Sequence, residues 1–217
     1  MTRKVIPGKI RLPEFELPSR WLVTEKIDGT NVRVILDPEG RKVDAPEGPD
    51  FWMYAPSVRF SGRTDAAQTP AKLLAVLQEM FLVEKVAAAF DPDTKAILFG
   101  EGYGPGIQKF GGNYRSTPGF RLFDVVVFGA NGRPWWLEWE NVADIAEKLG
   151  IQTVPVLYRD LTLEDLKYDE VIELPSAVAW YEGIKGWVQE GVVARTVPLL
   201  FTRNGQRVMW KLKGRDF

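Results

Sequence analysis

The sequence predicts an α+β domain made mainly of antiparallel strands, and three observations lead to this fold class. Seven short segments have the apolar and β-branched pattern of strands: 21–26, 31–37, 52–60, 95–101, 120–128, 190–196 and 207–213. These strand candidates outnumber the helical segments and interleave with them. Turn-forming residues also lie between strand-like runs, at 37–40, 130–132 and 203–206.

Three segments are candidates for helices. One follows Thr69-Pro70, where Thr can cap and Pro suits the first turn, and its leucines recur at helical spacing. A second is predicted over 138–149, where Gly150 ends it. A third begins at Thr162 and ends before Pro175. The helices therefore flank the predicted sheets.

The composition is that of an ordinary globular protein, and it excludes several kinds of chemistry. The 217 residues are 45% hydrophobic and 26% charged, enough for one large domain or two small ones. Histidine and cysteine are absent, which excludes disulfides, thiolate nucleophiles and a histidine base. No apolar stretch is long enough to cross a bilayer, and the start lacks a signal-peptide core. We therefore expect a cytoplasmic protein without a membrane partner.

The segment Glu25-Lys26-Ile27-Asp28-Gly29-Thr30-Asn31 lies between two predicted strands. A lysine at a strand end, followed by an acid and a glycine, suits an amine that points into a cleft. Gly29 permits a tight backbone path that a Cβ would obstruct. An unprotonated lysine amine can attack a phosphorus or carbonyl centre. An exposed lysine beside a hairpin is the alternative for this motif taken alone.

Acidic residues occur at the ends or in the middle of three other strands. Glu101 follows an apolar strand and is flanked by glycines, which let a ligand approach the backbone closely. Phe123 and Asp124 are adjacent in another strand, so strict alternation predicts that they face opposite sides. Glu190 is the first residue of the strand predicted over 190–196. Each of these features alone is also compatible with ordinary loops and core packing.

Lys211 and Lys213 lie two residues apart in the last predicted strand and therefore share a face. Two like charges so close together are unfavourable unless an anion lies between them. A triphosphate would be such an anion. The formal net charge of −1, however, gives no global attraction to nucleic acid.

In order and type, these segments resemble the conserved motifs of the covalent nucleotidyltransferases, and most closely the ATP-dependent, nick-sealing RNA ligases. The similarity runs from Glu25 to Phe217, and its most specific stretches are 25–31, 104–109 and 203–213. DNA ligases and capping enzymes usually have arginine where Asn31 stands, which favours the RNA ligases. The resemblance implies one adenylyltransferase domain over 1–217, with antiparallel sheets, flanking helices, an ATP-grasp-like ligase architecture and a central ATP cleft. No OB or helical C-terminal domain is expected after it.

The same resemblance implies a role for each matched residue. Lys26 would attack the α-phosphorus of ATP and hold AMP, and the AMP would pass to a 5′-phosphate RNA end that is then sealed to a 3′-hydroxyl. A Mg²⁺ or Mn²⁺ ion would meet Glu190, while Lys211 and Lys213 would bind the α-phosphate. The remaining matched residues would bind the nucleotide: Glu25 at the adenine amino group, Glu101 at the ribose, Phe123 on the adenine ring, Asn31 and Arg63 at ribose or phosphate, and Asp124 in the same pocket.

Two other functions remain compatible with these motifs. A DNA ligase or a capping guanylyltransferase shares the first chemical step, and a non-catalytic module that binds nucleotides or RNA ends would keep the fold without turnover. A partner protein that supplies RNA binding would compensate for the chain's lack of net positive charge.

Overall fold

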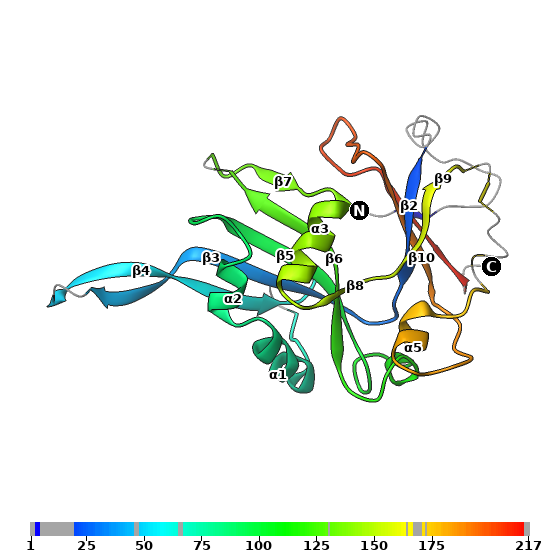
Figure 1. The fold of residues 1–217 in the computed structure, drawn as a ribbon, viewed down its shortest axis with the longest axis horizontal. Coiled ribbons are helices and arrows are strands. Elements are labelled where there is room, and N and C mark those ends of the chain that lie inside the picture. The colour runs from blue at the N-terminus through cyan, green and yellow to red at the C-terminus, as the bar shows by residue number, and fades with distance from the viewer. Residues whose placement is uncertain are drawn as a thin grey trace. The chain divides into compact units, whose positions relative to one another are not determined.

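The computed structural model describes residues 3–4, 20–45, 48–64, 67–129, 131–163, 165–166, 171 and 173–214 (Figure 1). The chain divides into two compact units. The first unit consists of Met1–Asp28, Phe110–Ser116 and Val154–Phe217, and the second of Gly29–Lys109 and Thr117–Thr153. Among the described residues, no helix is both long and apolar enough to span a membrane.

The first unit is built on a five-stranded sheet with the order β1-β11-β10-β2-β9 (Figure 1). Its strands are β1 (Arg3–Lys4), β2 (Trp21–Lys26), β9 (Val156–Leu161), β10 (Gly191–Thr196) and β11 (Met209–Lys213). All neighbours are antiparallel except β1 and β11, which are parallel. A short helix α5 (Ala177–Tyr181) and a 3₁₀ turn η2 (Gly111–Asn113) complete the unit.

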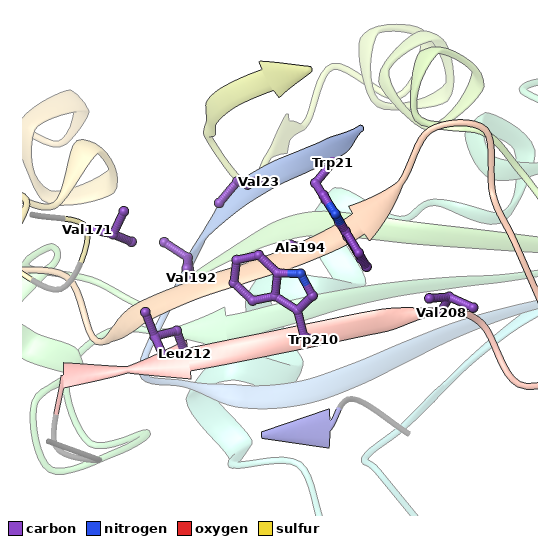
Figure 2. Packing of buried hydrophobic residues seen from close by; sticks show 8 residues of the cluster. All are labelled: Trp21, Val23, Val171, Val192, Ala194, Val208, Trp210 and Leu212. Carbon is purple, nitrogen blue, oxygen red and sulfur yellow. The ribbon is translucent and has the colours of Figure 1, made fainter. Parts of the chain in front are cut away.

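One face of this sheet forms the hydrophobic core of the first unit. Every second residue of three adjacent strands contributes to it, because side chains alternate along a strand. Figure 2 shows Trp21 and Val23 from β2, Val192 and Ala194 from β10, and Trp210 and Leu212 from β11, together with Val171 and Val208. The rings of Trp21 and Trp210 lie 5.8 Å apart at an angle of 56°. Burial of these side chains fixes the register of the three strands, since a one-residue slip would expose them.

The second unit contains a six-stranded antiparallel sheet in which β8 adds one parallel pairing. Its order is β4-β3-β5-β6-β7, and β8 pairs with β6. The strands are β3 (Thr30–Ala45), β4 (Gly48–Ser61), β5 (Lys95–Tyr103), β6 (Gly119–Phe128), β7 (Pro134–Trp136) and β8 (Gln152–Thr153). The helices are α1 (Ala71–Met80), α2 (Val83–Ala87) and α3 (Trp139–Lys148), and Leu73, Leu77, Val142 and Ile145 are buried.

The α+β class with antiparallel sheets is confirmed, and each of the seven predicted strands corresponds to an observed one. The helix predicted over 138–149 is also confirmed, and Gly150 follows it with a positive φ of 59°. The helix after Thr69-Pro70 begins at Ala71, but Pro70 occupies the N-cap and no side chain caps it. The proposed threonine cap is therefore wrong.

The predicted turn at Asp37-Pro38-Glu39-Gly40 is wrong. β3 continues through these residues to Ala45, and an irregularity in its pairing with β4 between Asp37 and Arg41 absorbs them. Pairing with a long partner strand thus overrides the local turn chemistry. The turns at 131–132 and 203–206 are confirmed by the Gly132–Gly129 and Thr202–Gln206 backbone hydrogen bonds of 2.8 Å each, although residue 130 lies outside the described residues.

The third helix candidate is only partly described, because residues 164, 167–170 and 172 lie outside the described residues. At its predicted start, the backbone N–H of Asp165 donates to Thr162 Oγ1 at 3.1 Å, as at the beginning of a helical turn. The sequence did not predict α5, which is only five residues long.

Candidate active site

The pairing of three strands brings two of the predicted lysines to one spot in the first unit. Gly191 at the start of β10 lies opposite Lys26 on β2 and opposite Lys213 on β11. Residues directly opposite in antiparallel strands project to the same side of the sheet. Lys26 and Lys213 therefore share the face opposite to the hydrophobic core. Lys211 lies one row further along, opposite Val193, and it projects from this same face.

Glu190 joins the two lysines. Its Oε2 accepts a short hydrogen bond from Lys26 Nζ, and its Oε1 accepts one of 2.6 Å from Lys213 Nζ. Lys26 Nζ also donates to the backbone carbonyl of Ile27 at 3.3 Å. The three side chains are only 20%, 14% and 11% exposed for Lys26, Lys213 and Glu190. One carboxylate thus accepts hydrogen bonds from two lysine side chains in a largely desolvated cluster, in which hydrogen bonds to a charged group are strong.

The cluster also alters the acidity of Glu190. Burial alone would raise the pKa of its carboxyl group. The charge of Lys26, hydrogen bonds from Lys213 and Lys26, and the charge of Lys213 act in the opposite direction and outweigh burial. The net result is a lowered pKa, so the carboxylate stays ionised near neutral pH.

The lowered pKa of Glu190 predicts a pH dependence of stability. The pKa of Glu190 in the folded protein lies below the usual value of 4.5. The ionised carboxylate therefore contributes fully to the free energy of unfolding above pH 4.5, and this contribution is lost as the pH falls through the folded pKa. We expect Glu190→Gln to have a lower free energy of unfolding than the wild type at pH 7 and a smaller loss below about pH 4.5. Urea unfolding at both pH values measures this difference. Parallel pH profiles of the two proteins would contradict it.

Gly191 makes room for this arrangement, and sequence reasoning missed it. Its φ is +153°, and an added Cβ would lie 2.0 Å from the backbone oxygen of Leu212 and 2.8 Å from Lys213 Cα. Only glycine accommodates both this backbone conformation and this approach. A side chain at position 191, between the strands of Lys26 and Lys213, would therefore displace the backbone of β11.

Glu25 is buried on the opposite face of β2 from Lys26, in the row of Val192 and Leu212. Its Oε1 accepts a hydrogen bond of 2.5 Å from Ser176 Oγ, and its Oε2 accepts one of 3.0 Å from the backbone N–H of Val178. Ser176 Oγ in turn accepts from the N–H of Ala179 at 3.0 Å, as N-cap of α5. This network joins β2, the strand that contains Lys26, to α5. Recognition of the adenine amino group by Glu25 stays a prediction.

The backbone after Lys26 has a second attachment. The N–H of Asp28 donates to the hydroxyl oxygen of Tyr114 at 3.2 Å. Tyr114 is completely buried, and burial raises the pKa of its hydroxyl to about 12, so it stays neutral. Lys26 is therefore held between Glu25 and Asp28, which are both tied to neighbouring segments.

Loss of the Ser176 hydroxyl is expected to weaken this support. Ser176→Ala leaves a buried oxygen of Glu25 and the N–H of Ala179 with one partner fewer. We expect a loss of about 1–3 kcal/mol in the free energy of unfolding, measured by urea denaturation. The exposed Ser116 offers a matched control, since Ser116→Ala should change stability by less than about 0.5 kcal/mol. Equal effects of the two substitutions would contradict a structural role for the Ser176 hydroxyl.

The second unit holds the other predicted nucleotide-binding residues. Asn31 on β3 is the direct pairing partner of Glu101 on β5. Gly29 precedes β3, and a Cβ there would lie 2.4 Å from the carbonyl oxygen of Gly102 and 2.8 Å from Glu101 Cγ. This confirms that a side chain at position 29 would obstruct the backbone path. Asn31, Glu101 and Gly29 therefore form a compact polar end of this sheet.

Phe123 and Asp124 lie on β6 at a β-bulge. The pairing changes from Phe99–Asp124 to Gly100–Leu122, which leaves Phe123 as the extra residue. The assumption of strict alternation is therefore wrong at this point. Asp124 is 2% exposed and Phe123 is half-buried. Their roles in nucleotide binding stay predictions.

Arg63 is exposed in the turn after β4, and a neighbouring arginine supports that turn. Arg33 donates from Nε to the carbonyl of Gly62 and from Nη2 to Ser61 Oγ, both at 2.8 Å. Sequence reasoning did not single out Arg33. The local sequence around Arg33 does not indicate which groups its guanidinium contacts, because the partners lie about 28 residues away in the chain.

Glu190 is the predicted ligand of a divalent cation, and in this structure both of its carboxylate oxygens accept hydrogen bonds from lysines. Within the described ranges, no group of three or more acidic side chains could hold an ion. Mg²⁺ and similar ions are commonly held by one or two carboxylates while water and substrate phosphates supply the other oxygens. The donor set therefore fits an ion that is held mainly by nonprotein oxygens, and it does not fit an ion enclosed by protein ligands.

Comparisons with known proteins agree with this architecture. The family model described as RNA ligase matches residues 19–213. Naegleria gruberi RNA ligase, solved as a lysine-to-methionine variant with AMP and Mn, is similar with a TM-score of 0.62 at 16% identity; the match covers 99% of this chain and 56% of that one. Its complex with PPi gives the same TM-score at 17% identity and the same coverage.

An archaeal ATP-dependent RNA ligase has a TM-score of 0.54 at 19% identity, with 98% of this chain and 46% of that chain covered. No curated protein matches the chain. The chain thus spans about half the length of these solved ligases, and at such identities the similarity establishes the fold. Since the family model covers nearly all of the sequence, the chain belongs to the RNA ligase family.

Proposed function

We propose that the chain is an ATP-dependent RNA ligase that acts through a covalent lysyl-AMP on Lys26. The observation that carries this proposal is the cluster of Lys26, Glu190 and Lys213 on one face of the first-unit sheet. A nucleophilic lysine, a second cation for a phosphate and an acid for a divalent ion are the groups that nucleotidyl transfer needs. Membership of the RNA ligase family and the ATP, AMP and Mn named for the solved relatives support the same conclusion.

In the first step, the unprotonated Lys26 amine attacks the α-phosphorus of ATP. A nitrogen–phosphorus bond forms, the bond from the α-phosphorus to the bridging oxygen breaks, and pyrophosphate leaves. The proton that the Lys26 nitrogen loses on attack passes to solvent, and Glu190, which accepts a hydrogen bond from Lys26 Nζ, holds the nitrogen in position. Lys213, with Lys211 beside it, stabilises negative charge on the phosphate.

The second and third steps transfer and release AMP. An oxygen of the RNA 5′-phosphate attacks the AMP phosphorus, the nitrogen–phosphorus bond breaks, and the Lys26 nitrogen takes a proton from solvent. A 3′-hydroxyl oxygen then attacks the phosphorus of the RNA 5′-phosphate, its proton passes to solvent, and the bond to AMP breaks, which releases AMP and joins the strands. Each step is an in-line substitution, so alignment and charge stabilisation provide most of the rate.

The remaining roles follow from the motif match. Glu101 and Asn31 bind the ribose, Phe123 stacks on adenine, and Glu25, Arg63 and Asp124 complete nucleotide recognition. Glu190 would hold Mg²⁺ or Mn²⁺ together with water and phosphate oxygens, and the ion would offset phosphate charge. A partner protein that adds RNA affinity is also compatible with the chain's net charge of −1.

Mass spectrometry after incubation with ATP or GTP tests the first step. We expect an added AMP with ATP and no adduct with GTP, and an adduct from GTP alone would indicate a capping-type enzyme. Sealing assays with matched nicked duplexes of RNA and of DNA then show which nucleic acid is the substrate. Sealing of DNA alone would replace the RNA assignment, and binding without any adduct would indicate the non-catalytic module.

A further inference from the structure

The end of α5 and the segment that follows it expose several aromatic side chains in the first unit. Trp180 and Tyr181 end α5 and are 65% and 63% exposed. Their ring centroids lie 5.4 Å apart at 67°, an edge-to-face contact. Large exposed aromatic side chains are costly in water and commonly mark a binding surface. We call residues 180–188 the aromatic loop.

The aromatic loop also presents bare backbone and an available cation. Gly183 and Gly186 both have positive φ, 82° and 78°, and no atom lies within 4 Å of where a Cβ would stand on either one. Lys185 between them is exposed, and no partner within the described part of the chain engages its ammonium group. Glu182 is already paired with Arg115, at 3.7 Å between Oε1 and Nη1. The unbalanced charge of the loop is therefore positive.

The loop is held in place at both ends. At its start, Ser176 caps α5 and hydrogen-bonds the buried Glu25. At its end, the ring of Trp187 packs against Phe110 at 5.7 Å and Tyr114 at 6.1 Å. A fixed platform loses less conformational entropy on binding than a mobile one. The exposed rings are thus presented by a supported segment of the chain.

We propose that the aromatic loop binds single-stranded RNA, with bases stacked on Trp180 and Tyr181 and a phosphate beside Lys185. Aromatic rings stack on any base, and a glycine-x-x-glycine turn lets a phosphodiester backbone approach closely. This chemistry fits unpaired nucleotides better than a protein partner, because the loop combines solvent-exposed aromatic rings with the exposed ammonium group of Lys185. The inference rests on the proposed function, since it identifies how a chain of net charge −1 holds its RNA substrate.

Fluorescence anisotropy with a labelled single-stranded RNA of about 12 nucleotides tests the proposal on the full chain. We expect the double variant Trp180→Ala, Tyr181→Ala to raise the Kd by about 30-fold or more. Lys185→Glu should also weaken binding and reduce the slope of log K against log salt by roughly 0.7, the value for one phosphate contact. This second variant keeps both rings and tests the loop even if the double variant unfolds.

Trp135 on β7 provides a matched control, since it is 72% exposed and lies in the second unit. Trp135→Ala should bind RNA as the wild type does. An unchanged Kd in the loop variants, an equal loss in Trp135→Ala or no RNA binding by the wild type would overturn the proposal. A wild-type dimer that the double variant abolishes would assign the loop to self-association instead. Formation of the covalent AMP adduct by each variant in the absence of RNA tests the proposed function separately from RNA binding.

Discussion

Lys26→Ala is expected to abolish the covalent AMP adduct while the protein stays folded. The amine at position 26 is the proposed nucleophile, and alanine provides no nitrogen to form the phosphoramidate. Labelling should fall by at least about 10³-fold, to the background of the assay. Intact-protein mass spectrometry after incubation with ATP and a divalent ion measures it. Circular dichroism should show wild-type secondary structure.

Lys148 offers a control of the same residue type. It is exposed on α3 and forms an i, i+4 ion pair of 2.9 Å with Asp144, far along the chain from the proposed chemistry. Lys148→Ala should retain wild-type labelling, because an exposed helical ion pair contributes little. An AMP adduct of wild-type yield in Lys26→Ala would show that another residue is the nucleophile.

Gly191→Ala should strongly destabilise the first unit and also reduce labelling. The added Cβ would meet the Leu212 carbonyl at 2.0 Å, and backbone atoms inside a sheet cannot move aside as a flexible side chain can. Because Gly191 pairs with both Lys26 and Lys213, any displacement would separate the two lysines. We expect a loss of about 3 kcal/mol or more in the free energy of unfolding, measured by urea denaturation.

Gly205 offers a control that separates the steric clash of an added Cβ from the cost of a positive φ. Its φ is +70°, and no atom lies within 4 Å of where its Cβ would stand. Gly205→Ala should therefore cost only the conformational penalty of about 1 kcal/mol. Equal losses in the two variants would mean that the close approach at Gly191 has no effect on stability.

The sequence predicted those parts of the fold that depend on local pattern. The apolar run over 21–26 and the alternation after it identified β2 and β3, and Gly150 correctly marked the end of α3. Where a partner strand decides the outcome, local reasoning failed. Asp37-Pro38-Glu39-Gly40 has turn chemistry, but β4 pairs with the residues on both sides and keeps β3 continuous. Phe123 likewise lies in a β-bulge, because the pairing of β6 with β5 skips this residue.

Local sequence patterns predicted which residues form the candidate active site, but they did not predict how these residues contact one another. Lys26, Glu190 and Lys213 were identified individually, but their contact depends on the strand order β11-β10-β2, which no local pattern contains. Ser176 and Gly191 were missed for the same reason. Ser176 meets Glu25 across 151 positions of sequence, and the constraint on Gly191 comes from the backbone of β11.

The alternation of β2 has a consequence for how this chain can change over evolutionary time. Six consecutive residues provide hydrophobic packing on one side of the strand and the amine of Lys26 on the other. Insertion or deletion of one residue within Trp21–Lys26 would exchange the two sides and so disrupt both the core and the placement of the proposed nucleophile. Length variation is therefore expected in the connections of this family, while this strand should keep its length in every active member.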